Sequence, residues 1–104
     1  MLVSKSKYAE GDIVAFKISN GDEVIAKIVE ENDYHYLVDK PCSVVASQQG
    51  IGLMQTLMTG DVSVAISINK NHIIMHSVVI EQVRNMYIQT TTGIQPVTKG
   101  GIIT

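Results

Sequence analysis

The chain has 104 residues, of which 45% are apolar and 17% are charged, and its formal net charge is −2. This length fits a single domain, and the composition excludes an intrinsically disordered chain, which would carry more charge and fewer apolar residues. The near-neutral charge, with no basic run, also excludes a protein that grips nucleic acid through a large basic surface alone.

The single cysteine, Cys42, cannot form an internal disulfide, and this favours a reducing compartment. Leu2 and Val3 are followed directly by serine and lysine residues, so the N-terminus lacks the apolar centre of a signal peptide. No apolar stretch approaches the roughly 20 residues of a membrane span. We therefore predict a soluble, cytoplasmic protein with no membrane partner.

The chain begins with a polar segment, residues 1–11, which we predict to be an irregular N-terminal arm or one short helical turn. The domain itself is predicted over residues 12–77, where apolar residues first alternate with a period of two. In the first predicted strand Val14, Phe16 and Ile18 fall on one face, which is typical of a half-buried β-strand.

Tight turns connect the next predicted strands. Asn20-Gly21 between two alternating apolar runs is a strong hairpin signal, and the second strand follows at residues 23–30. A second turn at 31–33 leads to a third strand at 34–46. Pro41 cannot donate a hydrogen bond to a sheet, so we expect this strand to bend or break there.

The second half of the chain changes its period. Residues 47–61 are predicted to be a loop whose apolar residues pack on the domain, followed by a fourth strand at 62–68 and a fifth at 72–75. Apolar spacings of three and four then predict a helix near 78–91 within a C-terminal segment of helix and tail, 78–104. Together these elements predict an all-β fold with one C-terminal helix, in which five short antiparallel strands curl into a small, strongly bent barrel.

The sequence contains no phosphate-binding loop and no motif of a nucleophilic enzyme. His72 and His76 are spaced for a metal only on a helix, whereas we predict a strand there. We interpret Cys42 as a small buried apolar side chain, and the acidic pair Glu30-Glu31 at a hairpin tip as solvated. We therefore predict that the protein is not an enzyme and holds no metal or cofactor.

Two local patterns resemble the motifs of the Sm-like (LSm) family. The first is an apolar strand, a glycine turn, a second strand and an Asp-aromatic segment, at 14–21, 23–28 and 33–38; the second is a pair of apolar strands at 64–75. The whole chain is also similar to short Sm-like proteins of marine bacteriophages. The resemblance implies a bent barrel of Sm-like or SH3-like type, assembly into a ring of identical subunits, and RNA binding.

The resemblance also implies an RNA site where the second and fourth turns line the pore of the ring. Here Tyr36 replaces the family's base-contacting Asn, and Asn69-Lys70 replaces its Arg-Gly. We predict that His35 stacks on a base and that Tyr36 stacks or donates a hydrogen bond, while Asn69 supplies an amide and Lys70 a cation. Each residue also has a structural alternative: His35 as an outward polar residue, Tyr36 in the core, and Lys70 solvated on its turn.

Two functions are open at this point. The first is a ring of five to seven subunits that binds single-stranded RNA at pore-facing turns, in RNA processing or regulation. The second is a structural or adaptor ring without nucleic-acid binding, which the departures from the family pocket favour. In either ring the edges of the fourth and fifth strands, with Ala65, Ile73 and Met75 outward, are predicted to pair between subunits.

Overall fold

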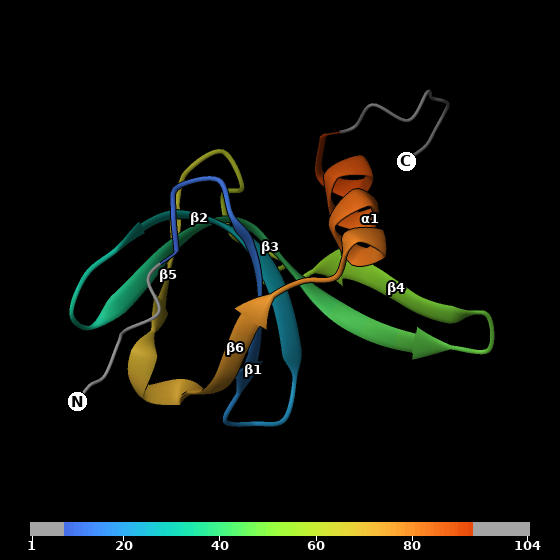
Figure 1. Cartoon of the computed structure of the whole chain (residues 1–104), viewed down its shortest axis with the longest axis horizontal. Helices are drawn as coiled ribbons and strands as arrows, with labels where there is room; N and C mark the ends of the chain where they lie inside the picture. Colours follow the sequence, from blue (N-terminus) through green and yellow to red (C-terminus); the bar gives the residue numbers. More distant parts are fainter. Residues whose placement is uncertain (1–7, 93–104) are drawn as a thin grey trace.

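A computed structural model describes residues 8–92 of the chain. The fold is mainly β with one C-terminal helix, as the sequence predicts (Figure 1). Its elements are β1 (Ile13–Ile18), β2 (Glu23–Glu31), β3 (His35–Ser47), β4 (Gly50–Gln55), β5 (Ile66–Asn69), the 3-10 turn η1 (Lys70–His72), β6 (Ile73–Val78) and α1 (Glu81–Thr92). The predicted tail at 93–104 and residues 1–7 of the predicted arm lie outside the described residues.

The strands form one antiparallel sheet in the order β4-β3-β2-β1-β6, with β5 also paired to β3. The long strand β3 thus has two partners along one edge: β5 pairs with residues 35–38 and β4 with residues 42–47. The sheet is strongly curved, and η1 connects β5 to β6 (Figure 1). Among residues 8–92 no strand pairing joins β5 to β6, so hydrogen bonds do not close the predicted barrel there.

The inner face of the curved sheet encloses the main core, which we call the inner core. It consists of Val14, Phe16, Ala26, Ile28, Tyr36 and Val38. The alternation predicted for the first two strands is therefore confirmed, and so is the turn between them, where Gly21 has a φ of 96°. That left-handed conformation suits glycine, which has no Cβ to clash.

Strand β3 changes face at Lys40, whose φ of 46° lies in the left-handed region. The register of β3 against β2 shifts here, because β3 contains an extra residue that makes a bulge. As a result Val38 faces the inner core, whereas Cys42 packs with Ile25 on the opposite side of the sheet. The bend predicted near Pro41 is confirmed.

Helix α1 covers that opposite side. Tyr87 is buried there with Ile13, and its hydroxyl donates to the backbone oxygens of Asp39 and Lys40, at 2.7 and 3.0 Å. The helix is therefore fixed to the bulge of β3. It has 12 residues, and in the described part of the chain no helix is long and apolar enough to cross a membrane.

Two predictions for the middle of the chain are wrong. Residues 50–55 are not loop but strand β4, which forms a projecting hairpin with the second half of β3 (Figure 1). Residues 62–65 are not strand, and only Ile66–Asn69 pairs with β3. The described chain therefore has six strands, and of the loop's apolar residues Leu53 packs toward α1 whereas Met54 is exposed.

Candidate functional site

The four predicted site residues come from two distant segments that meet at one end of the sheet. His35 and Tyr36 begin β3, Asn69 ends β5 and Lys70 begins η1. The register of β3 against β5 places His35 directly opposite Asn69. The backbone N–H of Lys70 donates to the carbonyl oxygen of Tyr34 at 2.9 Å, which fixes the two segments together.

The predicted side chains nevertheless divide between two faces of the sheet. Directly paired residues share a face, and successive residues of a strand point to opposite faces. His35 and Asn69 therefore lie on the outer face, whereas Tyr36 belongs to the inner core and is only 4% exposed. The structural alternative for Tyr36, a core residue, is the one observed.

The ring of Tyr36 packs within an aromatic cluster. The ring centres of Phe16, His76 and Tyr8 lie 5.2, 5.9 and 6.2 Å from it. The hydroxyl of Tyr8 is hydrogen bonded to Nδ1 of His76 at 2.6 Å. Burial, followed by the charges of Glu31 and Tyr8, raises the pKa of Tyr36, so its hydroxyl stays protonated at neutral pH.

Lys70 is held in an ion pair rather than solvated on its turn. Its Nζ lies 2.6 Å from Oε2 of Glu31 and 4.9 Å from the centre of the Tyr36 ring. The two side chains are only 28% and 18% exposed, and Oε1 of Glu31 is buried with no hydrogen-bond partner among the described residues. The prediction that Glu31 is solvated is therefore wrong.

A second irregularity explains why Glu31 turns inward. Ala26 and Ile28 face the inner core, and strict alternation would place Glu31 on the outer face. The register of β2 against β3 shifts between Ile28 and Glu30, so that Glu31 lies opposite Tyr36. This bulge brings the carboxylate to the Tyr36 ring.

Tyr34 is an exposed aromatic residue that sequence reasoning did not assign to the site. It is 73% exposed, in the turn between β2 and β3. The side-chain oxygen of Asn32 accepts the backbone N–H groups of Tyr34 and His35, at 2.9 and 2.8 Å, and so shapes this turn. The available signal was an aromatic residue at a hairpin tip, where core packing does not require one. We call Tyr34, His35 and Asn69 the rim.

Asn69 has a second role at the rim. Its Oδ1 accepts the backbone N–H of Asn71 at 2.8 Å and so caps η1. The cap uses the oxygen of the amide and not its nitrogen, which is a hydrogen-bond donor. Asn69 is therefore held in place with its donor side unused by the cap.

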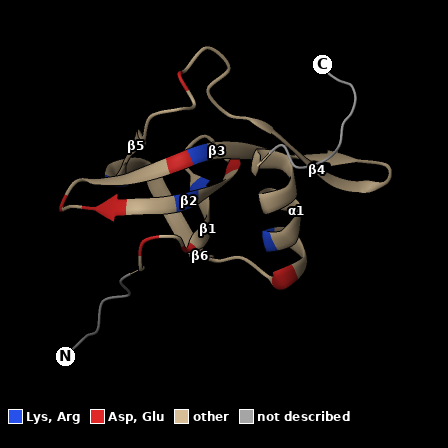
Figure 2. Ribbon diagram, turned by 90° about the horizontal axis from the view of Figure 1, so that it is seen from above, with Lys and Arg blue, Asp and Glu red and all other residues tan. Residues whose placement is uncertain are grey.

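The surroundings of the rim are acidic. Glu30 and Glu31 end β2, and Asp33 lies in the turn that follows. Figure 2 shows acidic residues in red at the end of β2 and in this turn. Because Lys70 is already paired with Glu31, a phosphate group meets little positive charge at this end of the molecule.

The predicted subunit edges are partly as expected. In the described chain β6 is one end of the sheet, and β4 and β5 form the other. Met75 is exposed on β6, but Ile73 packs against the inner core beside Ile18, because the register of β1 and β6 shifts at that point. The prediction that Ile73 points outward is wrong, and Ala65 is exposed but precedes β5.

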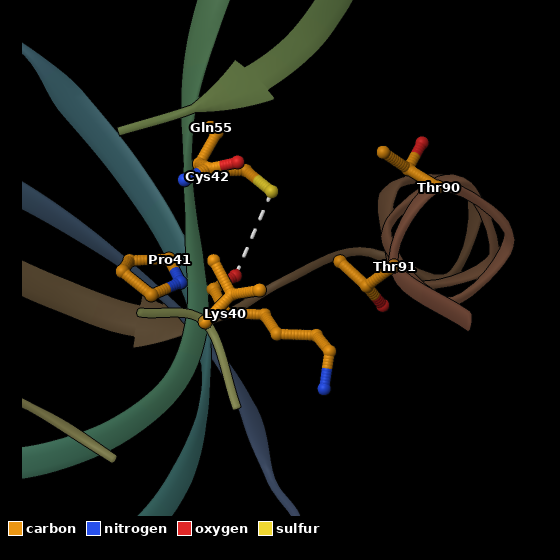
Figure 3. A pocket seen from close by; sticks show the side chains of 7 residues that line it. Lys40, Pro41, Cys42, Gln55, Thr90 and Thr91 are labelled. Carbon is orange, nitrogen blue, oxygen red and sulfur yellow. Dashed lines mark hydrogen bonds between the residues drawn. The ribbon is translucent and has the colours of Figure 1, made fainter. Parts of the chain in front are cut away.

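A cavity of about 210 Å³ lies between the bulge of β3 and the end of α1 (Figure 3). It contains none of the predicted site residues. Its lining consists of Lys40, Pro41, Cys42, Gln55, Val62, Thr90 and Thr91. Burial raises the pKa of the Cys42 thiol, whose Sγ lies 3.6 Å from the backbone oxygen of Lys40, so the reactive thiolate is disfavoured.

Among residues 8–92, no group of three or more His, Cys, Asp and Glu side chains gathers as a metal site would require. Comparison with models of protein families and with curated proteins finds no match to this chain.

Proposed function

We propose that the protein is an Sm-like ring subunit that binds single-stranded RNA at the rim. The observation that carries this proposal is the meeting of two distant segments, which puts half-buried His35 opposite Asn69 and next to exposed Tyr34. Aromatic rings stack on unpaired bases, and amide groups hydrogen bond to base edges. This end of the sheet therefore offers the two kinds of contact that read a single strand.

The free sheet edges support assembly into a ring. One edge is on β6 and the other on β4 and β5, so a subunit can pair one kind of edge with the other kind on its neighbour. Such a heterologous contact closes into a ring when the rotation between neighbours permits it. A ring repeats a weak site several times, and the overall affinity rises through avidity. The size of five to seven subunits is the family expectation.

A structural or adaptor ring is the second candidate, and two observations favour it. Tyr36 is in the core, and Lys70 is neutralised by Glu31. Two of the four predicted RNA contacts are therefore occupied within the subunit. In this second function the rim binds no nucleic acid, and the protein acts only by assembling through its free strand edges.

Fluorescence polarisation with labelled oligo-U and oligo-A, at low and moderate salt, separates the two functions. Tyr34→Ala is the main variant, because an exposed side chain can be removed without disturbing the core. Loss of one aromatic stack should weaken binding by about 1–3 kcal/mol per bound base, which is about 5- to 150-fold. Met58→Ala, an exposed apolar change in the turn after β4, is the matched control and should leave the affinity unaltered.

Two outcomes would count against RNA binding at the rim. Unaltered affinity in a Tyr34→Ala, His35→Ala double variant that keeps its assembly would remove the rim as the site. Absence of any affinity in the unmodified protein at low salt would remove RNA binding, and the adaptor ring would become the better account.

A further inference from the structure

The ion pair between Glu31 and Lys70 determines how a nucleic acid can meet this end of the molecule. A lysine that contacts a phosphate releases a condensed counterion, and this makes binding weaken as salt rises. Here the Lys70 ammonium is 2.6 Å from a carboxylate and partly shielded from solvent, so its charge is already balanced. A phosphate would have to compete with Glu31 for it.

We propose that Glu31 is a specificity-determining residue that makes the rim a site for unstacked bases rather than for the phosphate backbone. Glu31 balances the charge of Lys70 and keeps the lysine over the Tyr36 ring. This inference rests on the proposed RNA binding and deepens it. It predicts that the single strand is held by stacking and base-edge contacts, with little dependence on salt.

The placement of Glu31 is not explained by stability. Its Oε1 is buried without a hydrogen-bond partner in the described chain, and an unpaired buried carboxylate oxygen is unfavourable. The carboxylate reaches this position because β2 is bulged between Ile28 and Glu30. An outward, solvated glutamate on a regular strand would avoid the penalty but would leave Lys70 unpaired.

The ion pair also adds to the cover of Tyr36, whose ring the core already leaves only 4% exposed. Lys70 comes from η1, 39 positions after Glu31 in the chain, and its Nζ lies 4.9 Å from the ring centre. While the pair is intact, a base cannot take the place of the ammonium over that ring without separating it from Glu31. Stacking is thereby directed to the exposed aromatic rim, chiefly to Tyr34.

The test is the salt dependence of RNA affinity in the assembled protein with and without the carboxylate. Glu31→Gln releases Lys70, and each engaged subunit should gain one phosphate contact. For a single strand, one contact changes the slope of log K against log salt concentration by about −0.7, which corresponds to about 2.6-fold in affinity between 50 and 200 mM salt. The unmodified protein should show a shallow slope, and the variant a steeper slope with tighter binding at low salt.

Two further variants make the measurement specific. Glu30→Gln removes the same charge from the neighbouring exposed residue, which has no ion pair with Lys70, and should leave the slope as it is. The double change Glu31→Gln with Lys70→Ala should return the slope to that of the unmodified protein. Assembly mass and urea midpoint verify folding, and Glu31→Met, which suits the apolar side of Tyr36, replaces Glu31→Gln if that variant does not fold.

The outcomes separate this inference from the proposed function. Equal slopes for the unmodified protein and Glu31→Gln, with clear RNA binding by both, would overturn the role of Glu31 and leave RNA binding standing. An identical gain in Glu30→Gln would also overturn it, since the effect would then be one of general charge. If neither protein binds RNA at low salt, both proposals fall. RNA binding by Glu31→Gln alone would overturn both proposals, because the unmodified rim would then bind no bases.

Discussion

At the scale of single residues, three buried side chains have a pKa that is raised by burial. Tyr36, Cys42 and Tyr87 all lie in the two cores, and burial is the largest cause that raises the pKa of each. The pKa is raised most for Tyr87, where an electrostatic interaction with Cys42 adds to the effect of burial. Burial disfavours the charged form of a thiol or phenol, so the folded chain keeps all three groups protonated in mildly alkaline solution.

The stability of the chain should therefore fall at alkaline pH. Each folded-state pKa lies above its unfolded value, so the stabilisation is complete below the unfolded pKa, about 8.5 for Cys and about 10 for Tyr. It is lost as pH rises through the folded pKa, by up to about 1.4 kcal/mol per pH unit for each group. Urea unfolding between pH 7 and 10.5 measures this loss, and Cys42→Ala should flatten the curve between about pH 8.5 and 10.

A free energy of unfolding that stays constant over this range would contradict the assignment. The three groups would then titrate in the folded chain as they do in the unfolded one. The comparison with Cys42→Ala separates the thiol from the two phenols, because the thiol is the first of them to titrate in the unfolded chain.

The candidate site was predictable from sequence only in part, for reasons that lie in particular residues. His35 and Asn69 lie beside each other as predicted, and that prediction depends on the resemblance to Sm-like proteins, which implies that the second and fourth turns meet at one end. The inward position of Glu31 was not predictable, because the bulge in β2 reverses the alternation from which the inner and outer faces of a strand are inferred. A one-residue shift of this kind has no sequence signal of its own. The ion pair between Lys70 and Glu31 depends on this shift and could therefore not be predicted.

At the scale of the elements, regular apolar periods again predict the structure and interrupted periods do not. β1, the start of β2, and α1 follow from periods of two and of three to four, and the structure confirms them. β4 was hidden because Gly50 and Gly52 interrupt its apolar pattern and resemble a loop. The apolar alternation at 62–65 predicts a strand, but the β3 segment that it would continue along contains the bulge at Lys40, and pairing with β5 ends at Val38.

The contact between α1 and the bulge of β3 gives a test at this scale. Tyr87→Phe keeps the buried ring but leaves the carbonyl oxygens of Asp39 and Lys40 without the phenol donor. We expect the free energy of unfolding to fall by about 1–3 kcal/mol, as for other buried polar groups that lose a partner. Urea denaturation measures it, with Tyr34→Phe, an exposed hydroxyl, as the control that should change stability by less than about 0.5 kcal/mol. Equal effects of the two changes would show that the hydroxyl of Tyr87 does not fix the helix to the bulge.

At the scale of the whole molecule, the described chain has exposed apolar side chains beside its free edges. Ile74 and Met75 are exposed on β6, and Ile51 and Met54 are exposed on β4. Free strand edges with apolar side chains are prone to pair with another chain. Pairing of β6 with β4 or β5 of a neighbour would cover both edges at once, as the proposed ring requires.

The mass of the assembly in solution, with and without a single-stranded oligonucleotide, tests this account most directly. We expect one species of five to seven times 11.3 kDa that gains the mass of one bound strand. Met75→Lys should reduce that mass to that of smaller species, since a charge at a paired edge is unfavourable, whereas Val64→Lys, on an exposed residue outside the strands, should not. A monomer at micromolar concentration, or an isologous dimer that takes up no RNA, would contradict the ring and its proposed function together.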